Sequence, residues 1–205
     1  MKWLENVFRR RAPSKNSAIE KLYRYQKEMD PRTERLIVAL PQMAEAARQG
    51  GDYLYREVLH DLIRNYDLRF GSDVLSLIDD SKKAALIRKL TSLTLAQFFK
   101  ELAEIYPDTT VPSLLTDALH FEIYGVLPSQ DSFIDYLSYR NANFEDPKAA
   151  PAFKFGNDVA EILETLDLSF SFMVSQQYMI VREVSRKLIR FVLFNEPIEA
   201  DAQSP

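Results

Sequence analysis

The sequence contains no cysteine and only five glycines. Without cysteine the chain has no disulfide bond, no thiolate zinc site, no iron–sulfur cluster and no cysteine nucleophile. The glycines stand at positions 50, 51, 71, 125 and 156, so neither the dinucleotide-binding fingerprint nor the P-loop can be formed from them. The same spacing excludes the G-x-S-x-G turn of the α/β-hydrolases. Nucleotide binding through a glycine-rich loop is therefore excluded.

Long apolar runs and a strong excess of one charge are also missing. The longest uncharged stretch, residues 168–181, includes serines and glutamines and is too short and too polar to span a bilayer. The net charge of −4 is too close to neutral to indicate nucleic acid as a partner. No secretory signal is visible, so we expect a cytoplasmic protein, and no motif calls for a cofactor.

Hydrophobic residues make up 46% of the chain, and they recur at helical spacing. The clearest case runs from Gly156 to Asn195, with no glycine or proline between these ends. Its apolar residues exceed one face, which predicts a single long helix enclosed by others, with Phe170, Met173 and Val184 at the centre of the core. The predicted fold is all-α, a single-domain bundle of about six to eight helices around this long C-terminal helix.

Breaks in this pattern divide the chain into three parts. Pro13 and the polar residues after it separate a short basic arm, residues 1–14, from a helical domain, residues 15–196. The remaining residues, 197–205, are expected to be a flexible tail.

Within the domain, glycine, proline and aspartate mark the expected helix ends. Pro41 should kink or split the helix that begins at Pro31, Gly50-Gly51 should end it, and Asp52 should cap the next one. A long helix is expected to start at Asp80 or Ser81 and to stop before Pro107. Residues 141–155 contain two prolines and are predicted to form the one long loop.

Both histidines follow an acidic residue by three positions, in the pairs Glu57/His60 and Asp117/His120. On a helix this spacing places carboxylate and imidazole on one face, and it resembles the Glu-x-x-His pairs of ferritin-like di-iron bundles. The resemblance implies a metal-dependent helical enzyme as an alternative function. With 30 acidic residues in the chain an acid at this offset is common, so the main prediction is no metal site.

Two basic features are candidates for partner contact. Arg182, Arg186 and Arg190 form a ridge at intervals of four, which could hold phosphate or an acidic partner, or could be a solvated helix face paired with nearby carboxylates. The arm combines apolar residues on one helical face with three arginines, a pattern typical of an interfacial membrane anchor but also of docking on a partner or on the protein itself. The arm residues are Trp3, Leu4, Val7, Phe8, Arg9, Arg10 and Arg11.

No catalytic constellation emerges from these features. The sequence therefore favours a helical interaction or regulatory protein without catalytic activity, such as an adaptor or a chaperone-like binder, acting on a protein partner. The alternatives are the metal-dependent enzyme with Glu57, His60, Asp117 and His120, and a peripheral membrane protein anchored to anionic lipid by residues 1–11.

Overall fold

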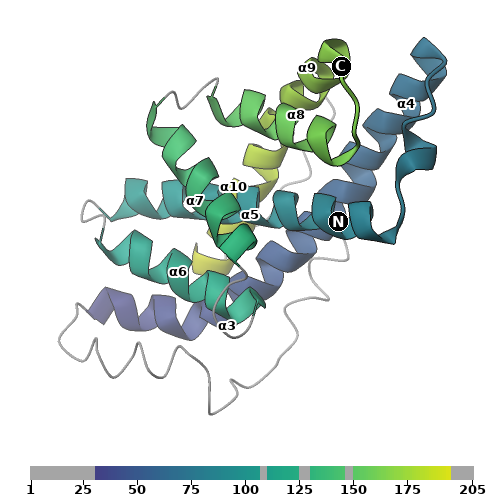
Figure 1. Ribbon diagram of the computed structural model, residues 1–205. Coiled ribbons are helices and arrows are strands. Elements are labelled where there is room, and N and C mark those ends of the chain that lie inside the picture. Colours follow the sequence, from purple (N-terminus) through teal and green to yellow (C-terminus); the bar gives the residue numbers. More distant parts are fainter. Residues whose placement is uncertain (1–30, 107–109, 125–129, 146–149, 195–205) are drawn as a thin grey trace, which may run out of the picture.

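The computed structural model describes residues 31–106, 110–124, 130–145 and 150–194, which form a single helical domain (Figure 1). No β-strand occurs within these ranges. The predicted all-α class is therefore confirmed. The arm, residues 1–14, and the tail, residues 197–205, lie outside the described residues.

Long helices account for most of this domain. In chain order they are α3 (Pro31–Leu54), a π-helical turn (Tyr55–Leu59), α4 (His60–Phe70), a 3₁₀ turn (Leu75–Leu77), α5 (Asp80–Ile105), α6 (Thr110–Tyr124), α7 (Gln130–Glu145), α8 (Ala150–Ile162), α9 (Leu168–Gln176) and α10 (Tyr178–Phe194). Gly71 ends α4 in a left-handed conformation with φ of 64°. The Asp79 carboxylate accepts a hydrogen bond from the Lys82 N–H, which caps the start of α5.

The most enclosed helix is α5. Every residue from Thr91 to Phe99 is buried, because α3, α6, α7, α8 and α10 all pack against this helix. In Figure 1 it runs across the middle of the molecule between these neighbours. A helix enclosed by others does stand at the centre of the domain, as predicted, but this helix is α5 and not the stretch from Gly156 to Asn195.

The predicted single helix from Gly156 to Asn195 is wrong, because α8, α9 and α10 share this stretch. The first break contains Glu164, whose φ of 56° is left-handed and ends the helical path. Asp167 then accepts hydrogen bonds from the N–H groups of Ser169 and Phe170 and caps α9. Phe170 is fully buried as predicted, whereas Met173 and Val184 are only partly buried.

Gly50 and Gly51 lie inside α3 and do not end it, and Asp52 is a helical residue and not a cap. The reason is close packing between helices. A Cβ atom on Gly51 would lie 2.3 Å from Oγ1 of Thr91 in α5, and one on Gly50 would lie 2.8 Å from Cδ1 of Leu188 in α10. The missing side chains let three helices approach one another, a role that local sequence does not reveal.

Pro41 and the prolines within residues 141–155 also interrupt the helices less than predicted. Helix α3 continues through Pro41, which therefore does not split it. The long loop predicted at residues 141–155 is wrong, since α7 extends to Glu145 and α8 begins at Ala150. Pro151 lies in the first turn of α8, where its missing N–H costs no hydrogen bond.

Candidate functional site

Large apolar side chains are exposed where the end of α4 lies beside α9. Leu166 is 98% exposed and Leu168 is 83% exposed, which is unusual for leucine in a folded domain. Both helices lie at the same end of the molecule (Figure 1). The exposed apolar residues carried by these elements are named the α4–α9 face; they are Leu68 and Phe70 of α4, Leu166 before α9, and Leu168 and Phe172 of α9.

Tyr66 joins the two helices beneath this face. Its ring lies between Phe70 of its own helix and Phe170 of α9, with centroid distances of 4.9 and 5.0 Å. Its hydroxyl donates a hydrogen bond to Asp167. Burial and this bond raise the pKa of Tyr66 to about 12, and the same bond is the main cause of the lowered pKa of Asp167. These contacts of Tyr66 therefore hold α4 and α9 together beneath the α4–α9 face.

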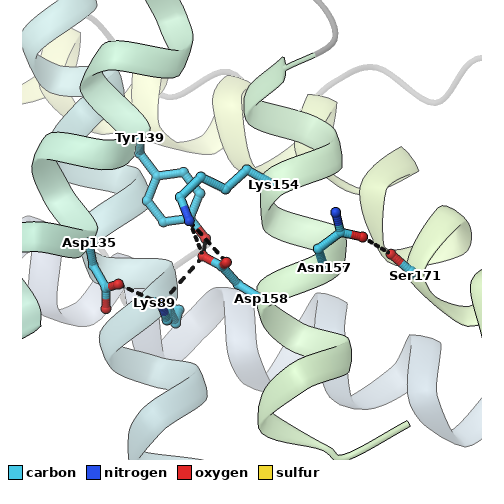
Figure 2. Close-up of polar contacts among 7 residues, drawn as sticks. All are labelled: Lys89, Asp135, Tyr139, Lys154, Asn157, Asp158 and Ser171. Carbon is cyan, nitrogen blue, oxygen red and sulfur yellow. Dashed lines mark hydrogen bonds and ion pairs between the residues drawn. The ribbon is translucent and has the colours of Figure 1, made fainter. Parts of the chain in front are cut away.

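A glycine contact holds α9 against α8. A Cβ atom on Gly156 would lie 2.3 Å from the carbonyl oxygen of Ser171 and 2.1 Å from Oγ of Ser175. The Ser171 hydroxyl also donates a hydrogen bond of 2.7 Å to Oδ1 of Asn157, as Figure 2 shows. One side of α9 is thus fitted closely to α8, whereas Leu168 and Phe172 are exposed to solvent.

Three carboxylates lie within two residues of the α4–α9 face along the sequence. Asp67 accepts hydrogen bonds from Oγ of Ser72 and from the N–H groups of Val74 and Leu75. Burial alone would raise the pKa of Asp67, but these bonds together lower it. Asp167 also has a lowered pKa, and Glu164 forms an ion pair with Lys82. Asp67 and Asp167 are therefore negatively charged at neutral pH.

A second polar region lies where α5, α7 and α8 meet (Figure 2). Lys89 of α5 reaches between two carboxylates, forming ion pairs with Asp135 and, at 3.4 Å, with Asp158. Asp158 also accepts a hydrogen bond of 2.7 Å from the Tyr139 hydroxyl and pairs with Lys154 at 3.0 Å. We call these five residues the polar clasp.

The polar clasp has as many positive as negative groups, and each is paired. Burial lowers the pKa of Lys89, but Asp135 and Asp158 outweigh it and raise the pKa above its ordinary value. An amine that stays protonated is a poor nucleophile or base. Burial and Asp158 likewise raise the pKa of Tyr139, which keeps its proton. The role that fits the polar clasp is therefore to hold helices α5, α7 and α8 together.

The two acid/histidine pairs lie in different surroundings. His60 is half-buried and its ring stands edge-on to Tyr55 at 6.2 Å, while Glu57 is exposed. His120 is fully buried and packs against the ring of Tyr124 at 4.6 Å. The side chain of Asp117 lies outside the described residues. Within the described part of the chain, no group of three or more histidine, aspartate or glutamate side chains is placed to hold a metal ion.

The arginine ridge follows the seam between α10 and α5. Arg186 pairs with Glu183 at 2.8 Å, and Nε of Arg190 lies 3.7 Å from a carboxylate oxygen of Glu101. Glu101 is buried, and its pKa is raised chiefly by burial. The carboxylates expected beside the ridge are therefore present for two of its three arginines.

The arm residues, Trp3 to Arg11, lie outside the described residues, so contact with membrane, partner or self stays a prediction. None of the helices in the described ranges has the length and apolar character needed to cross a bilayer.

Sequence reasoning missed both the α4–α9 face and the polar clasp. A signal for the clasp was present, because Lys154 and Asp158 are four residues apart on a helix and Lys89 interrupts an apolar face. For the face, the alternation of Leu166, Leu168, Phe170 and Phe172 was visible, but apolar residues are assigned to the core by default.

Comparisons of the chain with protein-family models, with curated proteins and with solved structures give no match. A function has to be argued from the chain's own surface.

Proposed function

We propose that this protein is a non-catalytic, regulatory interaction module that binds a protein partner through the α4–α9 face. The observation that carries the proposal is the nearly complete exposure of Leu166 and Leu168 on a rigid support. Clustered exposed apolar side chains mark interaction sites in soluble proteins, since single scattered ones are common but groups are not. Burying such leucines against a partner would contribute about 1.5–3 kcal/mol for each side chain fully covered.

The charges around the face indicate the chemistry of the partner. Asp67 and Asp167 have lowered pKa values, and Glu164 is 77% exposed at its side chain. A segment with apolar side chains flanked by lysine or arginine would place apolar groups on the leucines and cations near these carboxylates. We therefore propose an amphipathic basic segment as the bound element.

The arrangement of the polar clasp supports a binding rather than a catalytic role. Its lysines and aspartates neutralise one another, and Tyr139 is fully buried. General acid–base or nucleophilic catalysis needs a group whose pKa is tuned toward neutrality and which can reach a substrate. In the clasp, Lys89 and Tyr139 instead have raised pKa values, so both keep their protons at neutral pH.

The test begins with a photo-crosslinking amino acid placed at position 168 or, as a control, at position 38. Val38 is also highly exposed and apolar, at 73%, but it lies on α3. A crosslink that forms from position 168 and not from 38 identifies a partner, which is then purified for binding measurements.

The deciding measurement is the affinity of that purified partner for Leu168→Glu and Val38→Glu. We expect Leu168→Glu to weaken binding by about tenfold or more, because it places a charge in a buried contact, and Val38→Glu to leave it unchanged. Equal affinities for the Leu168→Glu variant and the original chain would overturn the proposal, as would equal losses for both variants.

A further inference from the structure

An exposed apolar stripe continues from α9 into α10. The chain passes between these helices without leaving helical geometry, because Gln177 has φ of −73° and ψ of −11° and its carbonyl oxygen accepts a hydrogen bond of 3.1 Å from the Val181 N–H. Side chains spaced by three or four residues therefore stay on one side across the turn. We call the exposed ones the α9–α10 stripe; they are Leu168, Phe172, Gln176, Met179 and Ile180.

The charged residues at the two ends of this stripe have opposite signs. Residues 168–181 are uncharged. The seven residues before them include three acidic side chains and no basic one, and the nine residues after them include four basic side chains and one acidic one. Two such stripes laid antiparallel would place the acidic end of each beside the basic end of the other. The α9–α10 stripe is therefore complementary to a second copy of itself.

The basic end of the stripe also has the chemistry that we propose for the element bound by the α4–α9 face. Met179 and Ile180 are exposed and apolar, and Arg182 and Arg186 follow them along α10. Arg186 pairs with Glu183, but its side chain is 42% exposed, so this ion pair is weak and can be exchanged for another. An amphipathic basic segment is thus present in this chain itself.

We propose that this protein forms a homodimer in which the α4–α9 face of each copy binds residues 179–186 of the other. This inference rests on the proposed function, and it names the partner as a second copy of the chain. Because the face and the bound segment adjoin along one helical path, a single twofold axis satisfies both contacts. The dimer is closed, and the same surface is used by both copies.

The position of the twofold axis follows from the stripe. With the axis beside Gln176, Phe172 of one copy lies opposite Ile180 of the other, since each is four residues from the axis. Asp167 is nine residues from the axis and lies opposite the stretch between Arg182 and Arg186 of the second copy. Apolar side chains thus meet near the axis, and opposite charges meet at both ends.

The first test is sedimentation equilibrium of the full chain over a range of concentrations. We expect a weak monomer–dimer equilibrium, because a single pair of helical segments is a small interface. Ile180→Glu places a charge opposite Phe172 of the second copy and should raise the dissociation constant at least about tenfold. Val38→Glu, the same kind of change at an exposed residue of α3, should leave it unchanged.

The second test uses the absence of cysteine from the chain, which makes an introduced thiol the only one. In Gln176→Cys the two thiols meet at the twofold axis, and mild oxidation should link the copies by a disulfide, which needs Cα atoms within about 7 Å of each other. Ser169→Cys is the matched control, at an exposed residue of the same helix. In the antiparallel dimer its two thiols lie about 20 Å apart, at 1.5 Å per residue, and should not be linked.

Three results would overturn the second copy as the bound partner. They are a chain that stays monomeric, a dimer that Ile180→Glu does not weaken, and equal disulfide linkage from positions 176 and 169. The proposed function is tested separately, because Ile180 lies outside the α4–α9 face. A monomeric chain whose position 168 crosslinks to a different protein would contradict the homodimer alone. Unchanged binding of that protein by Leu168→Glu would contradict the α4–α9 face itself.

Discussion

The polar clasp and the α4–α9 face lie on the two sides of α8 and use their residues in opposite ways. The clasp places lysine and aspartate between helices and pairs each of them, so that charge holds α5, α7 and α8 together. The face places leucine and phenylalanine in water and leaves them uncovered by any described residue. The comparison shows that in these two regions the position of a side chain relative to the neighbouring helices, and not its residue type, decides whether it is buried.

The contacts that hold α9 in place do not depend on the exposed side chains of the α4–α9 face. Helix α9 is fixed by the close contact of Gly156 with Ser171 and by the joint between Tyr66, Phe170 and Asp167. None of these contacts involves the outward side chains of Leu168 and Phe172. Leu168 and Phe172 are therefore not needed to position α9, and these two residues can serve to bind a partner.

Among the polar and glycine contacts between helices, the largest effect is expected from Asp158→Ala in the polar clasp. The substitution leaves Lys89, Lys154 and the Tyr139 hydroxyl without their shared acceptor, and breaking a buried ion pair in this way costs about 3 kcal/mol of unfolding free energy. Urea denaturation measures it. The control Asp52→Ala breaks an exposed pair with Arg56 and should cost less than about 1 kcal/mol. Similar losses in both variants would show that the clasp is not a structural joint.

A smaller loss is expected from Gly156→Ala, at the contact that holds α9. The new methyl group would meet the Ser171 carbonyl oxygen at 2.3 Å, so α9 must move away from α8 at a cost of about 1–3 kcal/mol. Phe153→Ala, at a residue of α8 that is 53% exposed, serves as the control and should change stability little. A Gly156→Ala variant as stable as the original chain would contradict the close contact.

The smallest effect, and the one that depends on pH, is expected from Tyr66→Phe. The pKa of Asp167 is lowered below its ordinary 3.8, so its contribution to stability is present above that value and is lost as the pH falls through the folded pKa. Because the Tyr66 hydroxyl is the main cause, the variant should melt at a lower temperature than the original chain at pH 6. The gap should narrow below a pH of about 4.

Tyr55→Phe is the control for this experiment. Tyr55 is also buried, but its raised pKa has burial as its cause and no carboxylate bond. Its effect on the melting temperature should be the same at both pH values. If the Tyr66→Phe gap is also constant with pH, the hydrogen bond to Asp167 does not stabilise the joint.

The sequence allowed the fold class and several helix ends to be predicted, because these depend on neighbouring residues. The start of α5 at Asp80 and its end before Pro107 were placed correctly, because a capping side chain and a proline act on the backbone next to them. Gly50, Gly51 and Gly156 were misread as helix ends because their role is contact with another helix. That contact exists only in three dimensions.

The candidate site was beyond sequence reasoning for a related reason. Leu168 and Phe170 are two residues apart on one helix, and both are apolar, yet one is 83% exposed and the other is fully buried. Which of them faces the core depends on where Asp167 starts the helix and on how α9 rests on α8. A prediction that assigned residues 156–195 to one helix could not separate them.

Helix α9 offers the most direct test of the claim that its outer side is free for binding while its inner side belongs to the core. The measurement is the unfolding free energy of Phe170→Ala against that of Phe172→Ala, two residues apart on this helix. Phe170 is fully buried against Tyr66, and its truncation should cost about 3–5 kcal/mol. Phe172 is 54% exposed, and its truncation should cost less than about 1 kcal/mol. Equal losses for the two variants would contradict the account.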